Sequence, residues 1–278
     1  MECREFKRKR PMKQKTHIFA VCAYGESPYL DECVRSLLAQ TVKSEIILVT
    51  STPNDHIRKC ADRYGLRVLV NRGQGGITQD WNYAYTHSHA RYVTIAHQDD
   101  FYEPDFLEHA LRRLEKSRRP LIFFTDYFEI RDGVRVYKNR LMFIKRLMLL
   151  PMMLPGAEHS RWIRRRILSF GSPICCPSVT YVKKNLPYAV FQHTFLACED
   201  WEAWEMISKI KGDFLYCTEP LVGHRIHEES VTTSIIRSHQ RSNEEIIMFR
   251  KFWPEWIARI LNREYAKAQS SNELEDEE

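Results

Sequence analysis

The sequence of 278 residues has no apolar segment long enough to cross a lipid bilayer. Its most apolar stretch, LMLLPMMLP at residues 147–155, is far shorter than the roughly 20 residues of a spanning helix, and it contains prolines. The charged N-terminus also lacks the apolar segment of a signal peptide. We therefore expect a cytoplasmic protein, with the inner face of the membrane as a second location.

Cysteine is present, but without the spacing of a metal knuckle. Eight cysteines are scattered along the chain, and Cys175 and Cys176 are directly adjacent. Reduced thiols are expected. The net charge of +6 is uneven, because residues 8–15 are basic and residues 273–278 are acidic. We expect two solvated tails and no nucleic-acid partner, since the basic tail alone would favour one.

From residue 16 onward, apolar runs alternate with helical patterns. Strands are expected at residues 17–24, 45–50, 67–71 and 92–97. The first helix is expected to have Ser27 as its N-cap and Pro28 as its first residue. This alternation predicts an α/β fold with a mostly parallel sheet and helices on both faces. Ligands bind such sheets beyond the carboxyl ends of the strands.

The second half of the chain has a mixed pattern. Asp132-Gly133 separates two β-rich runs and predicts a hairpin. A helix is expected to begin near Glu199, and another strand is expected at residues 214–227. A helical segment, interrupted by Pro254, follows.

Two carboxylates, Asp99 and Asp100, follow the strand expected at residues 92–97. Adjacent carboxylates at a sheet edge repel each other and need a cation or hydrogen-bond donors. Mg²⁺ or Mn²⁺ would suit them, because such ions take a few protein oxygens and complete their shell with water and phosphate. The alternative is that one aspartate caps the next helix and the other faces solvent.

A second carboxylate pair, Glu199-Asp200, is expected at a helix N-terminus. The helix dipole makes such pairs common, but beside a metal site one of them could act as a general base. Further on, Arg225 and His227 are two residues apart on a strand, so their side chains share one face. They could serve a phosphate and a metal, although most strand histidines are only hydrogen-bonded polar residues.

The glycine-rich segment NRGQGGITQDWN, residues 71–82, follows a strand and precedes a helix. A dinucleotide fingerprint would need a further glycine where the chain has Thr78. We expect a flexible turn near the ligand here, not a nicotinamide site.

Together, these segments resemble the family 2 glycosyltransferases of the GT-A fold, from about residue 16 to about residue 233. AYGESPYLDECVRSLLAQT is similar to the opening strand and helix of that family, and AHQDDFYEP to its D-x-D segment. CEDWEAW is similar to its E-D motif, and HRIHEES to its C-terminal arginine–histidine segment. The four occur in the order that the family has.

The resemblance implies a role for each matching residue. Asp99 would bind the divalent metal, with His227 as a second ligand. Asp200 would be the catalytic base of an inverting transfer, and Glu199 would orient the acceptor.

The resemblance also implies a set of donor contacts. The Ala23-Tyr24 turn would pack on the nucleobase, with Glu26 nearby, and Gly171-Ser172 would face the donor sugar. The remaining candidates for contact with the nucleotide sugar are Ser51, Asn71, Asn82, Gln98, Asp99, Asp100 and Arg225.

The chain departs from the family pattern at three places. Thr50-Ser51 replaces an aspartate pair, Trp81 replaces an arginine, and His97 replaces the first carboxylate of D-x-D. A catalytically inactive protein that binds sugar nucleotides therefore remains an alternative. A nucleotidyltransferase is another, although it would want a glycine- and lysine-rich phosphate loop that the N-terminal region lacks.

The expected function is transfer of a sugar from a nucleoside-diphosphate sugar to a glycan or lipid-linked acceptor in surface polysaccharide synthesis. Residues 140–166, basic and rich in methionine, could lie at a membrane interface or form a wall of the acceptor pocket. We favour a pocket wall with a membrane-facing edge. The expected organisation is a tail (1–15), one domain (16–233, with a nucleotide-binding half 16–115 and an acceptor half 116–233), C-terminal helices (234–268) and an acidic tail (269–278).

Overall fold

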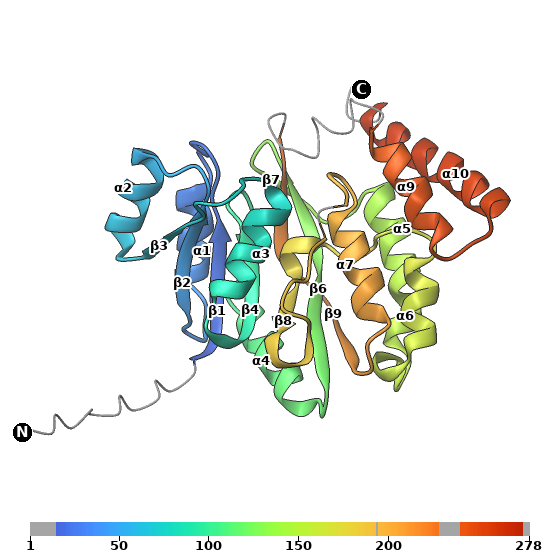
Figure 1. Ribbon diagram of the computed structural model, residues 1–278, viewed down its shortest axis with the longest axis horizontal. Helices are drawn as coiled ribbons and strands as arrows, with labels where there is room; N and C mark the ends of the chain where they lie inside the picture. Colours follow the sequence, from blue (N-terminus) through green and yellow to red (C-terminus); the bar gives the residue numbers. More distant parts are fainter. Residues whose placement is uncertain (1–14, 193, 228–239, 275–278) are drawn as a thin grey trace, which may run out of the picture.

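One mixed sheet runs through the molecule and has helices on both faces (Figure 1). The computed structural model describes residues 15–192, 194–227 and 240–274. The strands are β1 (Lys15–Cys22), β2 (Glu45–Thr50), β3 (Arg67–Val70), β4 (Ala90–His97), β5 (Phe101–Tyr102), β6 (Pro120–Arg131), β7 (Val134–Val136), β8 (Thr180–Val182) and β9 (Asp213–Ile226). The α-helices are α1 (Leu30–Leu38), α2 (Asp55–Tyr64), α3 (Ile77–His87), α4 (Phe106–Lys116), α5 (Arg140–Leu149), α6 (Arg161–Leu168), α7 (Glu199–Ser208), α9 (Gln240–Arg250) and α10 (Glu255–Leu274).

The sheet has a parallel half and a mixed half. Its order is β3-β2-β1-β4-β8-β6-β9-β5, with β7 paired to β6. Strands β1 to β4 are mutually parallel, whereas β8 pairs antiparallel with both β4 and β6. The predicted α/β fold with a mostly parallel sheet is confirmed. The carboxyl ends of β1, β2 and β4 therefore lie along one edge of the sheet.

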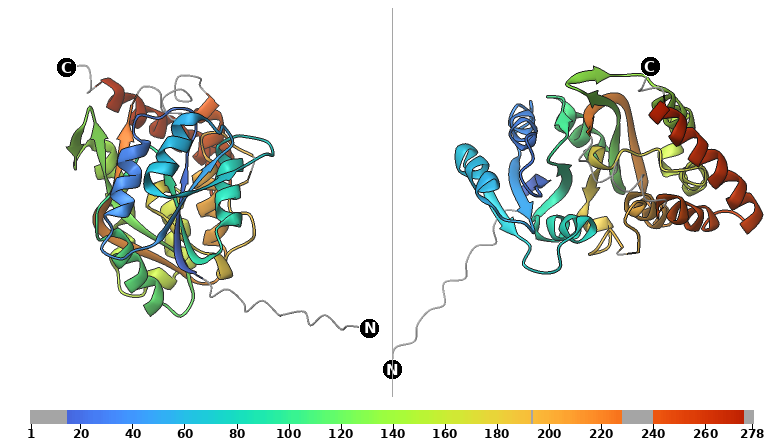
Figure 2. Two further views of the ribbon diagram at one scale, coloured as in Figure 1. Left: turned by 90° about the vertical axis from the view of Figure 1, so that its left-hand side faces the viewer. Right: turned by 90° about the horizontal axis from the view of Figure 1, so that it is seen from above.

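Alternate residues of the central strands fill two separate cores. In β1, Ile18 and Ala20 pack into one core, and Phe19 and Val21 into the other, as the two-residue period of a strand requires. Helices α1, α2 and α4 cover the second core, and α3, α6, α7 and α9 cover the first. The two rotated views show helices on either side of the twisted sheet (Figure 2).

The predicted hairpin is present, whereas the predicted cap of the first helix is wrong. Asp132 and Gly133 both have positive φ, 49° and 79°, and join β6 to the antiparallel β7. Helix α1, however, begins only at Leu30, and its N-cap position is Tyr29, which makes no side-chain cap hydrogen bond. The hydroxyl of Ser27 instead donates to Asp99. The same hydroxyl accepts from the N–H of Tyr29 (3.3 Å), so it has one local and one distant partner.

Arg164 of helix α6 caps the C-terminal end of α7. The Arg164 side chain is buried and donates to the main-chain oxygens of Ser208 (2.9 Å), Gly212 (2.5 Å) and Ile210. These carbonyls follow the last turn of α7, where main-chain acceptors lack helical partners. Burial lowers the pKa of Arg164 to about 10, so the guanidinium stays charged at neutral pH.

The C-terminal helices belong to the same core as the sheet. Met248 and Phe249 of α9 and Ala258 of α10 are fully buried and pack into the core that contains Trp201 of α7. Pro254 separates the two helices, as expected. Helix α10 extends to Leu274, so it includes part of the segment expected to be an acidic tail. None of the described helices is both long enough and apolar enough to cross a membrane.

Candidate active site

Asp99 stands just beyond the end of β4 and meets the end of β9. Its Oδ1 accepts a hydrogen bond of 2.6 Å from the hydroxyl of Ser27, which precedes α1. Its Oδ2 lies 3.4 Å from Nε2 of His227, the residue after β9 ends. Both side chains are partly exposed. The structure therefore brings together the two residues that the sequence suggested as metal ligands.

Arg225 holds this corner of the site in place. Its Nε donates to the main-chain oxygen of Asp99 (2.9 Å), and its NH2 group donates to Glu32 of α1 (2.8 Å). Its guanidinium also lies over the ring of Tyr29, 4.2 Å from the centroid. Since Arg225 is only 7% exposed, its contacts position the Asp99 loop against α1.

Asp100 is buried and faces away from solvent. Its Oδ1 accepts from the main-chain N–H of Arg225 (3.0 Å) and lies 3.1 Å from Nδ1 of His224. Burial alone would raise the pKa of Asp100, but His224, His97 and the Arg225 N–H outweigh it and lower the pKa. Burial opposes the charge of His224 too, yet the Asp100 carboxylate raises the pKa of this imidazole. These contacts fix Asp100 as the link between β4 and β9.

Gln98 fastens the loop after β1 to the end of β4. Its Oε1 accepts from the N–H of Tyr24 (2.9 Å), and its Nε2 donates to the oxygen of the same residue (3.0 Å). The preceding residue, Ala23, is buried and donates to Val49 of β2. The Tyr24 ring is 65% exposed, and Glu26 is exposed beside it. The turn thus exposes the Tyr24 ring at the edge of the sheet where the carboxyl ends of the strands lie.

A buried aspartate of α3 organises the ends of β2 and β3. Asp80 is 7% exposed and accepts from the Ser51 hydroxyl (2.6 Å) and from Nδ2 of Asn71 (2.7 Å). Asn71 also accepts from the N–H of Gly73, which shapes the glycine-rich turn. Ser51 and Asn71 therefore do lie together, at a position adjacent to the Ala23-Tyr24 turn on the same sheet edge.

The two residues after Asp80 have structural contacts. The indole of Trp81 stacks on the imidazole of His97, with centroids 5.0 Å apart. The Asn82 amide donates to the oxygen of Phe191 (2.7 Å) and accepts from the N–H groups of Val190 and Phe191. Asn82 thus links α3 to the segment before α7 through main-chain partners.

Asp200 lies in the first turn of α7 and faces the loop that follows α6. Its Oδ1 accepts from the N–H of Trp201, and its Oδ2 lies 3.4 Å from the hydroxyl of Ser172. Gly171 has a φ of 146°, and a Cβ on it would lie 2.7 Å from the ring of Tyr265 in α10. Glu199 is 6% exposed at the start of the helix. The structure thus places Ser172 next to Asp200.

The adjacent cysteines connect the two carboxylate segments. Burial raises the pKa of the Cys175 and Cys176 thiols well above its usual range, and the charges of Asp100 and Asp200 raise it further. Both carboxylates therefore act electrostatically on this pair of thiols. These thiols stay protonated. They pack between β4 and α7 and do not act as nucleophiles.

Several positioning residues had no recognisable signal in the sequence. Glu244 of α9 is 7% exposed, and its carboxylate accepts from the N–H groups of Leu196, Ala197 and Cys198, just before α7. It takes the place of the missing side-chain cap of that helix. The sequence predicts Ser27 only as a helix cap. Asp80 could have been recognised as a carboxylate on the helix that follows the glycine-rich turn.

Comparison with known proteins identifies the family of the chain. Residues 18–176, more than half of the chain, match the family described as "Glycosyl transferase family 2". The chain belongs to glycosyl transferase family 2. It is a glycosyltransferase, and the match spans the Ala23-Tyr24 turn and the Asp99 loop.

Relatives and solved structures agree with this family. An uncharacterized glycosyltransferase of Rickettsia typhi is 22% identical over 94% of this chain and 78% of its own length. The glycosyltransferase GlyG of Streptococcus pneumoniae is 27% identical over 40% of this chain and 39% of its own.

Two solved glycosyltransferases share the fold. S. aureus TarS 1–349 in complex with UDP-GlcNAc has a TM-score of 0.61 at 15% identity, over 92% of this chain and 73% of that one. The mannosyltransferase PcManGT from Pyrobaculum calidifontis, in complex with GDP-Man and Mn²⁺, has a TM-score of 0.57 at 15% identity, over 92% and 70%. The expected GT-A fold is confirmed.

Proposed function

We propose that this glycosyltransferase moves a sugar from a nucleoside-diphosphate sugar to a hydroxyl of a glycan or lipid-linked acceptor for surface polysaccharide, with inversion and with Mg²⁺ or Mn²⁺ bound. The observation that carries the proposal is the pair formed by Asp99 and His227. These residues are far apart in sequence and meet, with 3.4 Å between Oδ2 and Nε2, where β4 and β9 end.

This pair has the geometry of two ligands of one ion. Ligand atoms about 2.1 Å from a metal, at octahedral to tetrahedral angles, are about 3.0–3.4 Å apart. A carboxylate oxygen with an imidazole nitrogen suits Mn²⁺, and the carboxylate also suits Mg²⁺. A bound ion would supply a Lewis acid for the diphosphate of the donor. Asp99 and His227 would hold that ion, and Ser27 would orient the carboxylate.

The donor nucleotide would lie across the ends of β1, β2 and β4. The exposed ring of Tyr24 offers a stacking surface for a base, and Gln98 keeps this turn in place. Ser51 and Asn71 are ordered by Asp80 next to it. TarS binds UDP-GlcNAc and PcManGT binds GDP-Man, and these two are the first donors to test.

Asp200 is the proposed base for the acceptor hydroxyl. It accepts the hydroxyl proton while the acceptor oxygen bonds to the anomeric carbon and the bond from that carbon to the diphosphate oxygen breaks. Attack from the face opposite to the leaving group inverts the anomeric carbon. Gly171 and Ser172, next to Asp200, would border the donor sugar, and Glu199 would border the acceptor.

The first experiment is a thermal-shift titration of UDP-, GDP-, dTDP- and CMP-sugars with and without Mn²⁺. One nucleotide class should stabilise the wild type, and Mn²⁺ should increase that effect. Asp99→Asn should lose the metal-dependent part, while Asp55→Asn, an exposed carboxylate on α2, should behave as the wild type. Equal stabilisation of Asp99→Asn and wild type would contradict the assignment of Asp99.

A second variant tests the base. Asp200→Asn should reduce transfer at least 1,000-fold, a loss of the order that removal of an essential general base produces, while the donor still stabilises the protein. Loss of donor binding would instead give Asp200 a role in binding the donor. Release of pyrophosphate without sugar transfer would favour a nucleotidyltransferase, and donor binding without any turnover of wild type would favour an inactive binding protein.

A further inference from the structure

The segment between β7 and α6 presents an apolar stripe to solvent. Phe143 and Leu147 of α5, and Leu150 and Leu154 beyond it, recur at helical spacing and are 51–66% exposed. The opposite side of the same segment packs against the domain, since Met142, Leu149 and Met152 are buried. We call the four exposed residues the apolar stripe. The residues of the stripe have large side chains, are close together in the sequence and do not belong to the buried core.

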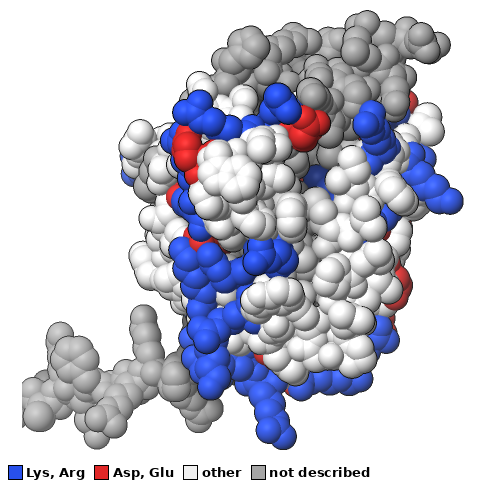
Figure 3. Space-filling view, turned by 90° about the vertical axis from the view of Figure 1, so that its right-hand side faces the viewer, with Lys and Arg blue, Asp and Glu red and all other residues white. Residues whose placement is uncertain are grey.

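The sequence around the stripe is rich in cations, two of which, Arg135 and Arg146, pair with carboxylates from other segments. Residues 133–157 contain five Lys or Arg residues and no Asp or Glu. Figure 3 looks at the side of the molecule formed by the C-terminal helices and α6, and shows a broad area without charged residues, bordered by Lys and Arg and with few carboxylates. This combination of apolar side chains with flanking cations is typical of helices that lie in the interface of an anionic bilayer.

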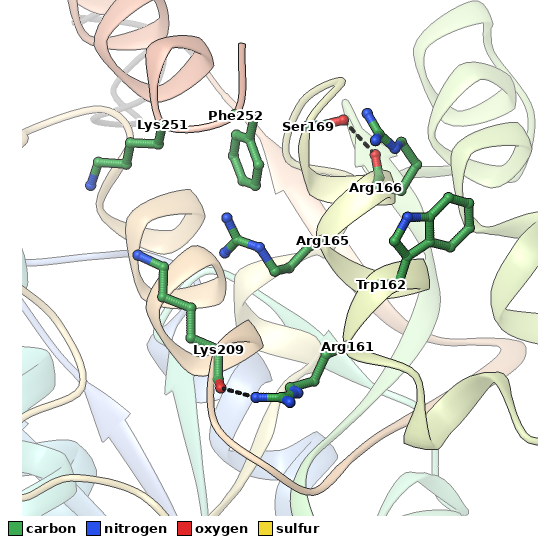
Figure 4. A pocket seen from close by; sticks show the side chains of 8 residues that line it. All are labelled: Arg161, Trp162, Arg165, Arg166, Ser169, Lys209, Lys251 and Phe252. Carbon is green, nitrogen blue, oxygen red and sulfur yellow. Dashed lines mark hydrogen bonds between the residues drawn. The ribbon is translucent and has the colours of Figure 1, made fainter.

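A basic cleft of about 390 Å³ opens next to this segment, along α6. Five cations line it, from three helices: Arg161, Arg165 and Arg166 of α6, Lys209 after α7, and Lys251 after α9 (Figure 4). Trp162, 69% exposed, lies at its margin.

The cleft has more positive charge than its carboxylates balance. Glu205 pairs with both Arg165 and Lys209, and Glu202 pairs with Lys251. Five cations against two carboxylates leave a net charge of +3. Within the described part of the chain, Arg161 and Arg166 have no carboxylate at ion-pair distance. A phosphate group would complete this set of donors.

Helix stability does not explain Arg161. Arg161 stands at the N-terminus of α6, where the helix dipole disfavours a cation. Arg161 and Arg165 are four residues apart, so their like charges repel along the helix. Only Arg164 is buried for a structural purpose. Arg161 is therefore unfavourable for the helix, as expected of a residue that meets an anionic partner. Arg165 and Arg166 lie in the last turn, where the dipole favours cations, and Arg165 also pairs with Glu205.

We propose that the apolar stripe, Trp162 and the basic cleft together form a docking surface for a bilayer of anionic phospholipid. The stripe and the indole enter the headgroup region, and the cleft receives a lipid phosphate. This surface is separate from Asp99, His227 and Asp200, so the inference goes beyond the proposed function. Vesicle binding can be measured without any donor or acceptor.

The test is sedimentation of the full chain with large unilamellar vesicles, either of phosphatidylcholine alone or with 30% phosphatidylglycerol. We expect binding to the anionic vesicles that weakens when salt is raised. Leu147→Ser should weaken it about tenfold. Arg161→Gln/Arg166→Gln should weaken it at least tenfold, about fivefold for each charge. Circular dichroism should show that all variants are folded.

Matched controls lie on the far side of the molecule. Leu38→Ser changes an exposed leucine of α1, and Arg58→Gln/Lys59→Gln removes two exposed cations from α2. Both should bind vesicles as the wild type does. Equal losses in the control variants would show nonspecific attraction and overturn the proposal.

Three further outcomes would also overturn it. Equal binding to both vesicle types, or to neither, would exclude an anionic surface as the partner. Protection by inorganic phosphate in a thermal-shift assay without vesicle binding would make the cleft a site for a soluble phosphate. A dimer in sedimentation velocity that Leu147→Ser dissociates would make the stripe an interface between two copies of this chain.

Discussion

His17 is a titratable residue inside the sheet that has no part in the proposed chemistry. It is 4% exposed, and its two ring nitrogens lie 2.8 Å from the Ser44 hydroxyl and 2.9 Å from the Thr94 hydroxyl. Thr94 in turn bonds Thr180 of β8, so the imidazole belongs to a polar chain across the strands. Burial lowers the pKa of His17 to about 3, which keeps the ring neutral.

This pKa predicts that the free energy of unfolding falls in mild acid. Between pH 6.5 and about 3, the unfolded chain binds a proton at His17 that the folded chain does not, so acid favours unfolding. From pH 7 to pH 5, His17 should contribute a loss of about 2 kcal/mol. Urea unfolding at pH 7 and pH 5 measures this. The free energy of unfolding of His17→Gln should fall between these pH values by about 2 kcal/mol less than that of the wild type, whatever the stability of the variant at pH 7.

The exposed His89 provides the control. His89→Gln removes an exposed imidazole just before β4 and should keep the pH difference of the wild type. If His17→Gln also keeps that difference, the acid sensitivity belongs to other groups.

At the scale of the elements, α7 depends on partners outside itself at both of its ends. Its C-terminal carbonyls are satisfied by Arg164 of α6, and the N–H groups before it by Glu244 of α9. Its N-cap residue, Cys198, makes no side-chain cap hydrogen bond. Because Asp200 lies in the first turn, these two buried charges also determine where the proposed base stands.

Replacement of Arg164 should therefore be costly. Arg164→Leu leaves three buried carbonyls without donors, and we expect it to lower the free energy of unfolding by about 3 kcal/mol or more. Arg164→Lys should recover part of this loss. Arg161→Leu, a neighbouring exposed arginine, should change it by less than about 0.5 kcal/mol. Urea denaturation measures all three, and a near-neutral Arg164→Leu would contradict the capping role.

On the scale of the whole molecule, the C-terminal helices complete the domain. A boundary at residue 233 would remove Met248, Phe249 and Ala258, which are fully buried in the core around Trp201 and Trp204. It would also remove Glu244 and leave three main-chain N–H groups without their acceptor.

A chain that ends at residue 233 should therefore lack a cooperative thermal transition. The reason is that its core would be open along α7, and large apolar side chains would meet water. A chain that ends at Leu274 keeps all of α10 and should unfold as the full protein does. Differential scanning calorimetry compares them, and a sharp transition in the shorter chain would show that residues 16–233 fold alone.

Local sequence patterns were enough for most of the fold. Apolar runs and helical spacing gave the alternation of β1 to β4 with their helices, and Asp132-Gly133 gave the hairpin, because these signals depend on neighbouring residues. The Asp99 and His227 pair was also anticipated, through the resemblance to a family. Strands β4 and β9 that end at one edge are what bring these two residues together.

Side-chain partners at long range could not be predicted in the same way. Ser27 has the sequence context of a helix cap, yet its hydroxyl serves Asp99 because the sheet places β4 beside it. The hydrogen bonds from the Asn82 amide to the main chain of residues 190 and 191 likewise join segments that are distant in sequence. Arg164 is one of several arginines in RWIRRR, and only the packing of α6 on α7 distinguishes it.

The contact between Glu244 and the start of α7 also has a consequence for protein synthesis. The ribosome makes the N-terminal half of the sheet first, then α7, and only afterwards the helix that contains Glu244. A nascent chain can therefore complete the parallel strands and expose Asp99 before the proposed base has its final support. Catalytic competence should arise only when α9 has left the ribosome, so a stalled or prematurely ended chain would hold the donor edge of the sheet without a finished enzyme.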